Sequence, residues 1–228
     1  MMRSTLKRRC LPLLLAVVLA PFTWAQIRFG TPIKYNLNAP EGGGGYQSLA
    51  VADFNGDGRP DAAAGVADGV IIIINKGDGT FGTTPIIYGL PGGSGIGVVL
   101  AADFNRDGHP DLAALSDSGG NLYVLLNNGD GTFGSPSVYH IGFRGKGLGM
   151  GNFDEDGILD LVASANGVLD VFHGKGDGTF TLLSTSNAEF DFFQVADLNG
   201  DGLDDLYTGV VANSLTVMLN KTSVRRKR

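Results

Sequence analysis

An all-β fold is predicted for this chain, built like a β-propeller from four repeats of a four-stranded antiparallel blade, and three observations predict it. An acidic segment of nine residues recurs four times, beginning at Asp53, Asp103, Asn152 and Asp197. A Gly-Asp-Gly-Thr-Phe segment recurs in step with it, at residues 77–81, 129–133 and 176–180. Between these segments lie runs rich in Val, Ile and Leu that are too short for a helical period. Evenly spaced short strands indicate a sheet-based repeat.

The elements are expected in the same order in every repeat. An inner strand is followed by the acidic loop, a second strand, a third strand, the Gly-Asp-Gly turn and an outer strand. In the first repeat the strands are expected near residues 48–52, 61–66, 70–74 and 81–88. Because Gly and Asp suit tight turns, we interpret Asp78, Asp130 and Asp177 as turn residues and not as metal ligands. The repeats are expected at about residues 47–90, 97–143, 147–188 and 193–220.

The two ends of the repeat region are out of phase with each other. Residues 29–35 are similar to the outer strands that begin at Phe81 and Phe133, although no inner strand precedes them. The fourth repeat stops after its third strand, near Asn220. The strand missing from the last blade is therefore the one present at the start. We predict that residues 29–35 complete the last blade and cover its open edge.

Residues 1–25 have the pattern of a signal peptide. Four basic residues precede an apolar run at residues 11–20, and small residues suit cleavage after Ala25. Ten apolar residues are too few to cross a bilayer as a helix, so an uncleaved membrane anchor is the less favoured alternative. We predict a secreted, extracellular protein, or a periplasmic one in a bacterium, with repeats at residues 26–220, a basic tail at residues 221–228 and no transmembrane segment after cleavage.

Composition limits the partners of the mature chain. Residues 1–25 hold four of the 17 basic residues and none of the 23 acidic ones, so the rest has a net charge of −10. Five of the remaining basic residues lie in the tail, which we interpret as a solvated end. Such an acidic body is a poor match for nucleic acid. The one cysteine, Cys10, lies in the signal region, so metal sites gain importance for stability.

The acidic segments have the residue pattern of metal-binding loops. Positions 1, 3, 5 and 9 carry side-chain oxygens, position 7 offers a backbone carbonyl, and glycine at position 6 permits a sharp turn. Two carboxylates about 5 Å apart repel by roughly 3 kcal/mol, and a cation removes that conflict. Oxygen donors without His or Cys favour calcium, about one ion per repeat and up to four. The predicted ligands are Asp53, Asn55, Asp57, Arg59, Asp61, Asp103, Asn105, Asp107, His109, Asp111, Asn152, Asp154, Asp156, Ile158, Asp160, Asp197, Asn199, Asp201, Leu203 and Asp205.

Two other readings of these loops compete with calcium binding in a propeller. Turn residues on a solvated rim explain one such loop, but not the same oxygen positions in four. An EF-hand or dockerin loop begins with the same spacing, yet an EF-hand needs a bidentate Glu at position 12. Position 12 is occupied by Ala64, Ala114, Ala163 and Thr208.

With these loops, the Gly-Asp-Gly-Thr-Phe turns and the Phe-Gly-x-Pro strand starts, the chain resembles the FG-GAP and VCBS repeats, as in the integrin α-subunit propeller. The resemblance covers almost all of residues 27–220. It implies a propeller whose calcium loops lie between the first and second strands of each blade. The third loop departs from the pattern with Asn152 in place of Asp, which implies a weaker site, although Asp154 at position 3 restores the number of charges. The family commonly closes with seven blades, so a closed four-bladed ring, half of a homodimeric ring and a truncated product remain open.

We expect a binding module and not an enzyme. Four near-identical loops suit a structural role for calcium, whereas catalysis usually needs one site that differs from its neighbours. His109, His140 and His173 are scattered, with no partner Ser, Cys or Asp motif. Adhesion to an extracellular protein is the first hypothesis. A lectin-like module that binds a glycan, or the non-catalytic part of a polysaccharide-active enzyme, is the alternative, and a hydrolase or lyase comes third.

Ligand contacts are expected on the face opposite the calcium loops. Loops there differ between repeats, and variable loops on a rigid repeat commonly carry binding. They comprise residues 38–46, 89–97, 142–147 and 185–192. The candidate contact residues within them are Tyr46, Phe143, Arg144, Lys146, Phe190 and Phe192.

Overall fold

The computed structural model describes residues 30–35, 48–92, 95–187, 192–211 and 214–222. The chain falls into two units, Met1–Lys34 and Tyr35–Arg228, and all described strands belong to the second. The predicted signal peptide and most of the basic tail lie outside the described residues.

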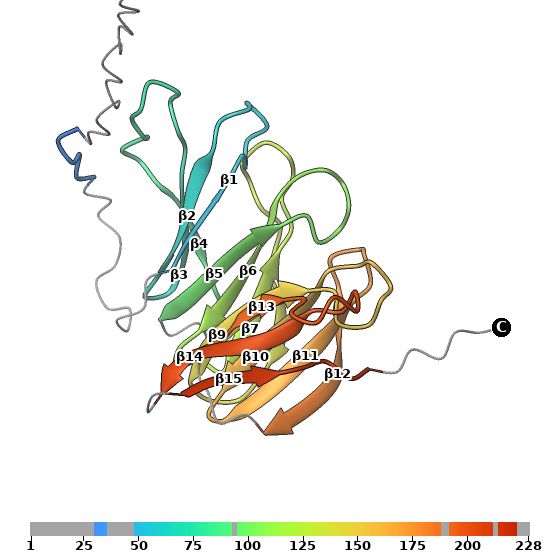
Figure 1. Ribbon diagram of the computed structural model, residues 1–228. Coiled ribbons are helices and arrows are strands. Elements are labelled where there is room, and N and C mark those ends of the chain that lie inside the picture. The colour runs from blue at the N-terminus through green and yellow to red at the C-terminus, as the bar shows by residue number, and fades with distance from the viewer. Residues whose placement is uncertain (1–29, 36–47, 93–94, 188–191, 212–213, 223–228) are drawn as a thin grey trace, which may run out of the picture. The chain divides into compact units, whose positions relative to one another are not determined.

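Four antiparallel sheets follow one another along the chain (Figure 1). The first sheet contains, in order, β1 (Leu49–Ala52), β2 (Asp61–Val66), β3 (Gly69–Ile73) and β4 (Ile86–Gly89). The second contains β5 (Ile96–Ala102), β6 (Asp111–Ser116), β7 (Asn121–Leu125) and β8 (Ser137–His140). The third contains β9 (Gly145–Gly151), β10 (Asp160–Ala165), β11 (Val168–Gly174) and β12 (Phe180–Asn187). The fourth contains β13 (Gln194–Ala196), β14 (Asp205–Val211) and β15 (Ser214–Met218).

Each sheet is a meander, in which every strand pairs with the next strand of the chain. Short apolar segments punctuated by Gly, Asn and Asp favour this arrangement, because hairpin turns join antiparallel strands directly. The predicted all-β fold of repeated antiparallel blades is confirmed.

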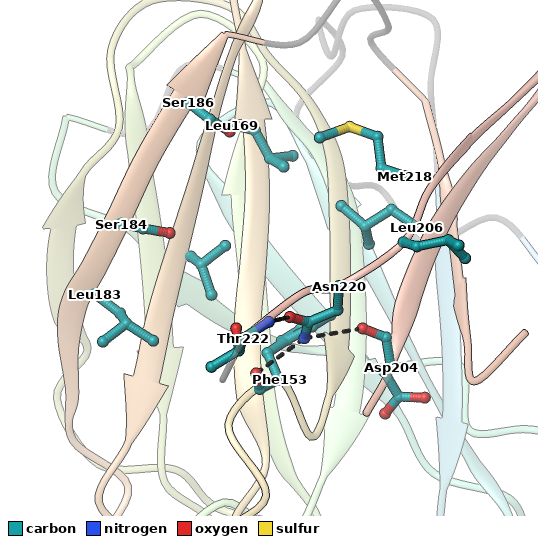
Figure 2. Close-up of a pocket in the computed structure, with 12 residues that line it drawn as sticks. Phe153, Leu169, Leu183, Ser184, Ser186, Asp204, Leu206, Met218, Asn220 and Thr222 are labelled. Atoms are coloured by element: carbon teal, nitrogen blue, oxygen red, sulfur yellow. Dashed lines mark hydrogen bonds between the residues drawn. The ribbon is translucent and has the colours of Figure 1, made fainter. Parts of the chain in front are cut away.

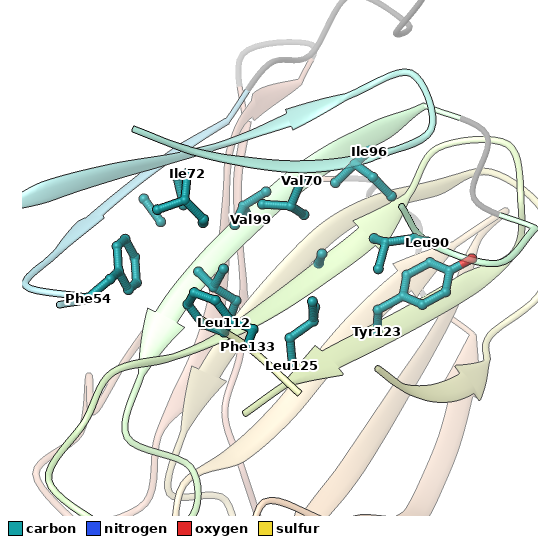
Figure 3. Close-up of a cluster of buried hydrophobic side chains, with 13 residues drawn as sticks. Phe54, Val70, Ile72, Leu90, Ile96, Val99, Leu112, Tyr123, Leu125 and Phe133 are labelled. Carbon is teal, nitrogen blue, oxygen red and sulfur yellow. The ribbon is translucent and has the colours of Figure 1, made fainter. Parts of the chain in front are cut away.

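The hydrophobic core lies between consecutive sheets and not within any one of them. One buried cluster joins the first and second sheets (Figure 3), a second cluster joins the second and third, and a smaller one joins the third and fourth. On β6, Leu112 and Ala114 belong to the first cluster, while Ala113 and Leu115 belong to the second. Successive side chains of a strand point to opposite faces, so a strand between two clusters is apolar at every position. No cluster of the described residues joins the fourth sheet to the first, so these sheets do not close into a ring.

A tyrosine and a phenylalanine form a second link between consecutive sheets, which we call the Tyr–Phe latch. The hydroxyl of Tyr88 on β4 accepts the backbone N–H of Phe133 at 3.1 Å, and the rings meet edge to face. Tyr139 on β8 accepts the N–H of Phe180 in the same way at 3.0 Å. Both phenylalanines end a Gly-Asp-Gly-Thr-Phe segment, so this turn fixes the outer strand of the preceding sheet.

The prediction that residues 29–35 complete the last blade is not realised. Residues 30–35 form no strand, and the fourth sheet has three strands among the described residues. Tyr35 instead makes a latch with the first sheet, where its hydroxyl accepts the N–H of Phe81 at 3.1 Å. A strand requires a ladder of backbone hydrogen bonds, and one aromatic anchor does not supply it.

Candidate metal centres

Each acidic loop joins the first and second strands of its sheet, at β1–β2, β5–β6, β9–β10 and β13–β14. These strands are directly paired, with Ala52 opposite Asp61 and Ala102 opposite Asp111. Position 9 is therefore the first residue of the second strand, and positions 1 to 8 form the loop.

The first loop is folded by its own side-chain oxygens. The Asp53 carboxylate accepts the N–H of Asp57 at 3.1 Å and that of Gly58 at 2.7 Å. Asn55 Oδ1 accepts the N–H of Asp57, and Asp57 Oδ1 accepts the N–H of Arg59. Asp and Asn side chains readily bond nearby backbone N–H groups, here two, four and five residues further along the chain. As a result, the oxygens of positions 1, 3 and 5 turn into the loop.

The second and fourth loops repeat this geometry. Asp103 accepts the N–H of Gly108 at 2.9 Å, and Asp197 accepts that of Gly202 at 3.0 Å. The glycine at position 6 has φ of 88° and 91° in these two loops, which confirms the predicted need for glycine there. Position 4 is also left-handed, and two loops place a side chain at it, Arg106 with φ of 64° and Glu155 with φ of 67°.

The carboxylate at position 9 has a role that sequence reasoning missed. Asp111 is fully buried, with Oδ2 accepting the N–H of Phe104 at 2.9 Å and Oδ1 accepting the N–H of Asn127 at 2.8 Å. It thereby ties the start of the loop to the end of the third strand. The same pair of bonds occurs at the ninth position of the other three loops, made by Asp61, Asp160 and Asp205.

Burial raises the pKa of Asp61, Asp111 and Asp160 above the ordinary value, and their two backbone N–H donors oppose that rise. Neighbouring loop carboxylates add to the rise, and for Asp61 these are the carboxylates of Asp57 and Asp53. Desolvation disfavours the charged form, whereas hydrogen bonds to the carboxylate favour it. A nearby cation would favour the charged form as well.

The third loop differs from the other three in its polar contacts. The side-chain oxygen Oδ1 of Asn152, at position 1, is buried and accepts no hydrogen bond from the loop backbone. His173, at the end of β11, places Nδ1 2.8 Å from Asp154 Oδ2 and 3.9 Å from Asp156 Oδ2. Asp154, Asp156 and His173 form a group whose ligand atoms all lie within 4.8 Å of one another. Sequence reasoning placed His173 beside a strand without a partner, because the loop that it reaches precedes it by more than ten residues.

The first, second and fourth loops offer a donor set that fits a hard cation. Their side-chain donors are carboxylate and amide oxygens, and calcium takes six to eight such oxygens at about 2.3–2.6 Å. Negative charge is concentrated there, and in the first loop Arg59 Nη1 lies 3.4 Å from Asp57 Oδ2. The carbonyls of Arg59, His109, Ile158 and Leu203 stay predicted ligands. These loops could hold calcium through positions 1, 3 and 5.

The Asp residues of the Gly-Asp-Gly turns bond within their turns. Asp130 Oδ1 accepts both the N–H and the hydroxyl of Thr132, and Asp78 and Asp177 bond Thr80 and Thr179 in the same way. The hydroxyl and N–H of the threonine lower the pKa of each of these carboxyls. The interpretation of these residues as turn formers is confirmed.

The predicted contact residues lie in part at the opposite edge of the sheets. The loop that contains Phe143 precedes β9, whereas the acidic loop follows it, so the two loops lie at opposite ends of this strand. The Phe143 side chain is 68% exposed. Lys146 pairs with Asp117 at 3.5 Å, and Arg144 and Lys146 line a shallow hollow with Asn166 and Gly167. Phe192 is half-exposed. Tyr46 and Phe190 lie outside the described residues.

A groove lies where the third sheet meets the fourth (Figure 2). Leu169, Leu206 and Met218 supply an apolar lining, and Ser184 and Ser186 on β12 add hydroxyls. The groove ends at the Asn220 amide, which donates to the carbonyl oxygens of Phe153 and Asp204. Sequence reasoning missed this groove because its residues come from separate repeats.

The molecule is a propeller-like repeat protein. Its antiparallel sheets repeat along the chain, pack through their apolar faces and carry an acidic loop at the same turn. The chain matches the model of the FG-GAP-like repeat over residues 53–114, 103–151 and 152–208. These matches cover more than half of the chain, which therefore belongs to the FG-GAP-like repeat family. The described residues include no helix with the length and apolar character that membrane crossing requires.

One solved structure shares the fold at low sequence identity. A lectin of Agrocybe aegerita, described for specific recognition of non-reducing terminal N-acetylglucosamine, is 23% identical with a TM-score of 0.54. The similarity covers 77% of this chain and 50% of the lectin chain, so this chain spans half the lectin's length. The Photorhabdus luminescens Tc holotoxin pore is 23% identical with a TM-score of 0.47, over 73% of this chain and 8% of that one. Comparison with curated proteins gave no match.

Proposed function

We propose that the chain is a secreted, calcium-binding repeat module that acts in adhesion or protein-ligand binding, with calcium as a structural ion. One observation carries the proposal: three loops fold around inward-turned carboxylates at positions 1 and 5 in the same hydrogen-bonded form. Uncompensated, such a concentration of charge opposes folding. The proposal assigns no catalytic step to the chain.

Calcium binding is tested by thermal unfolding of the purified protein with excess calcium and with a chelator. If free calcium exceeds each dissociation constant tenfold, each site contributes about 1.4 kcal/mol, or roughly 4 kcal/mol for the three oxygen loops. A domain of this size gains about 2–4 °C per kcal/mol, so we expect a rise of roughly 8–16 °C.

The variant Asp57→Ala/Asp107→Ala/Asp201→Ala should lose this rise. A matched variant with Asp78→Ala and Asp130→Ala removes carboxylates from the Gly-Asp-Gly turns and should keep it. The proposal fails if calcium does not raise the melting temperature, or if the turn variant loses the response as completely as the loop variant.

The binding role is supported by the exposed loops at the edge opposite the acidic loops. Phe143 offers an exposed aromatic ring beside the positive charge of Arg144, a combination enriched at protein interfaces. The partner is proposed to be an extracellular protein, and not nucleic acid. Binding to the surface proteins of target cells, measured with and without a chelator and after deglycosylation, tests this role. Phe143→Ala should weaken it.

A lectin-like carbohydrate-binding module is the second candidate, and the groove at the third and fourth sheets favours it. Ser184 and Ser186 there offer hydroxyls beside apolar Leu169. The lining contains no Trp or Tyr on which a sugar ring would stack, and Phe153 is its one aromatic residue. Binding to an array of glycans, competed by free monosaccharide, would favour the lectin over the adhesion module.

A homodimer that completes a larger propeller is part of the proposal. Within the described part of the chain, the first and fourth sheets each have a neighbouring sheet on one side alone, and apolar side chains stay exposed there, with Leu49 and Val51 on β1 and Leu215 and Val217 on β15. In every other junction such faces pack against the next sheet. Light scattering tests the mass: a dimer is expected, and a monomer would refute this part alone.

A further inference from the structure

Two buried side-chain atoms without hydrogen bonds lie at the third acidic loop. Among the described residues, the buried side-chain nitrogen and oxygen atoms without a hydrogen-bond partner are Asn152 Oδ1 and His173 Nδ1. Buried polar groups are nearly always bonded, and an exception points to a missing ion or other partner. Both exceptions lie in one loop site, where Asp154 and Asp156 add carboxylates.

His173 Nδ1 lies within 4 Å of oxygens of more than one loop carboxylate. Its Nδ1 is only 2.8 Å from Asp154 Oδ2, yet the orientation makes no hydrogen bond. Asp156 Oδ2 lies 3.9 Å from the same nitrogen. Ligand atoms around a tetrahedral zinc ion, at about 2.0–2.2 Å from the metal, are about 3.4 Å apart. The two observed separations lie on either side of that value.

No other loop of the chain has this histidine. In each repeat, a backbone N–H near the end of the third strand donates to the ninth-position Asp, and the residue that precedes this donor can be compared between repeats. That residue is His173 in the third repeat, and Ile74, Leu126 and Leu219 in the others. The third loop is also the one that has lost the carboxylate at position 1, where Asn152 stands. Asp154 stands at position 3, where the other loops have Asn, so the third loop keeps three carboxylates and adds one imidazole nitrogen.

We propose that the third loop binds a transition-metal ion of the zinc class through His173, Asp154 and Asp156, with water completing the coordination. A neutral imidazole with carboxylates suits zinc, nickel and cobalt, whereas calcium takes oxygen donors. Asp160, whose Oδ1 lies 3.5 Å from His173 Nδ1, keeps its bonds to the N–H groups of Phe153 and Gly174. This site does not depend on calcium binding by the other loops.

Titration of the purified, calcium-saturated protein with zinc chloride by calorimetry tests the proposal. One zinc ion per chain should bind in excess calcium. His173→Leu removes one of three protein ligands and should lower zinc affinity by roughly 100-fold or more, since even outer-shell partners of a metal are worth about 10–100-fold. Cobalt should give the visible absorption of a low-symmetry site in the wild type and not in this variant.

His109→Leu is the matched control, because His109 is position 7 of the second acidic loop, keeps its backbone carbonyl in this variant, and has its ring against Gly129. It should leave zinc binding unchanged. His173→Leu should fold as the wild type does, since Leu stands at this position in two other repeats, and its calcium-dependent rise in melting temperature should persist. The proposal is overturned if zinc does not bind in calcium, if His173→Leu binds zinc as the wild type does, or if His109→Leu loses it. Calcium binding could fail while zinc binding holds, so the two proposals are separable.

Discussion

Replacing Asp111 tests whether the ninth-position carboxylate holds the loop together or serves only as a metal ligand. Its two oxygens accept buried N–H groups of Phe104 and Asn127, one at the start of the loop and one past the end of β7. Asp111→Ala leaves both donors without an acceptor. Asp111→Asn keeps one acceptor oxygen and places an amide N–H₂ against the other donor.

An unsatisfied buried donor costs about 1–3 kcal/mol, so Asp111→Ala removes about 2–6 kcal/mol from the free energy of unfolding. The variant no longer buries a carboxylate, whose desolvation raises the Asp111 pKa, and this offsets part of the lost free energy of unfolding. We therefore expect a net loss near the middle of the range. Asp111→Asn should lose about 1–3 kcal/mol. At about 2–4 °C per kcal/mol, a net loss of about 4 kcal/mol should lower the melting temperature of the alanine variant by roughly 8–16 °C.

The assay is urea unfolding followed by circular dichroism, performed in a chelator so that no metal contributes. Asp130→Ala, which removes an exposed turn carboxylate, is the control and should lose less than the Asp111 variants. If Asp111→Ala is destabilised only when calcium is present, the carboxylate acts as a ligand and the reasoning from its backbone bonds is wrong.

Three further predictions concern single side chains. Glu155→Gly should stabilise the protein by about 0.5–1 kcal/mol in urea unfolding. Removing a side chain from a residue with left-handed φ gains about 1–2 kcal/mol, whereas the greater entropy of glycine in the unfolded chain costs about 0.5–1 kcal/mol. Tyr88→Phe keeps the ring contact but removes the acceptor for the Phe133 N–H, so the urea midpoint should fall by the equivalent of about 1 kcal/mol. Asp130 has a lowered pKa in the folded state, so the unfolded state binds more protons as the pH falls below the ordinary value of 3.8. The stability advantage of the wild type over Asp130→Asn should therefore be present at pH 7 and disappear near pH 2, and an advantage that grows in acid would contradict it.

The fold was predictable because its signals are local and repeated. The alternation of acidic loop, short apolar run and Gly-Asp-Gly turn specifies a meander, and the apolar face on each side of β6 follows from residues such as Leu112 and Ala113. Turn chemistry was equally readable, since Asp130 bonds Thr132 two residues away. Each of these inferences needs only a few neighbouring residues.

The missed features depend on contacts between distant segments. The Tyr88–Phe133 latch spans 45 residues, and a tyrosine in an outer strand gives no sign of its partner. His173 joins the third loop only after β10 and β11 pair and bring it back beside Asp154. The burial of the ninth-position Asp carried a signal in the sequence, since this residue stands at the start of an apolar strand, and its ligand role stays a prediction.

The Tyr–Phe latch also sets the order in which the molecule should come apart. It secures the junctions of the first sheet with the second and of the second with the third, but the fourth repeat has no Gly-Asp-Gly-Thr-Phe segment to receive a tyrosine. The junction of the third and fourth sheets also has the smallest buried cluster. In a linear array each unit is held by its neighbours alone, so the unit with the weakest junction opens first. Backbone amides of β13–β15 should exchange with solvent by opening of that sheet alone, while β6 and β7 exchange only when the whole array unfolds.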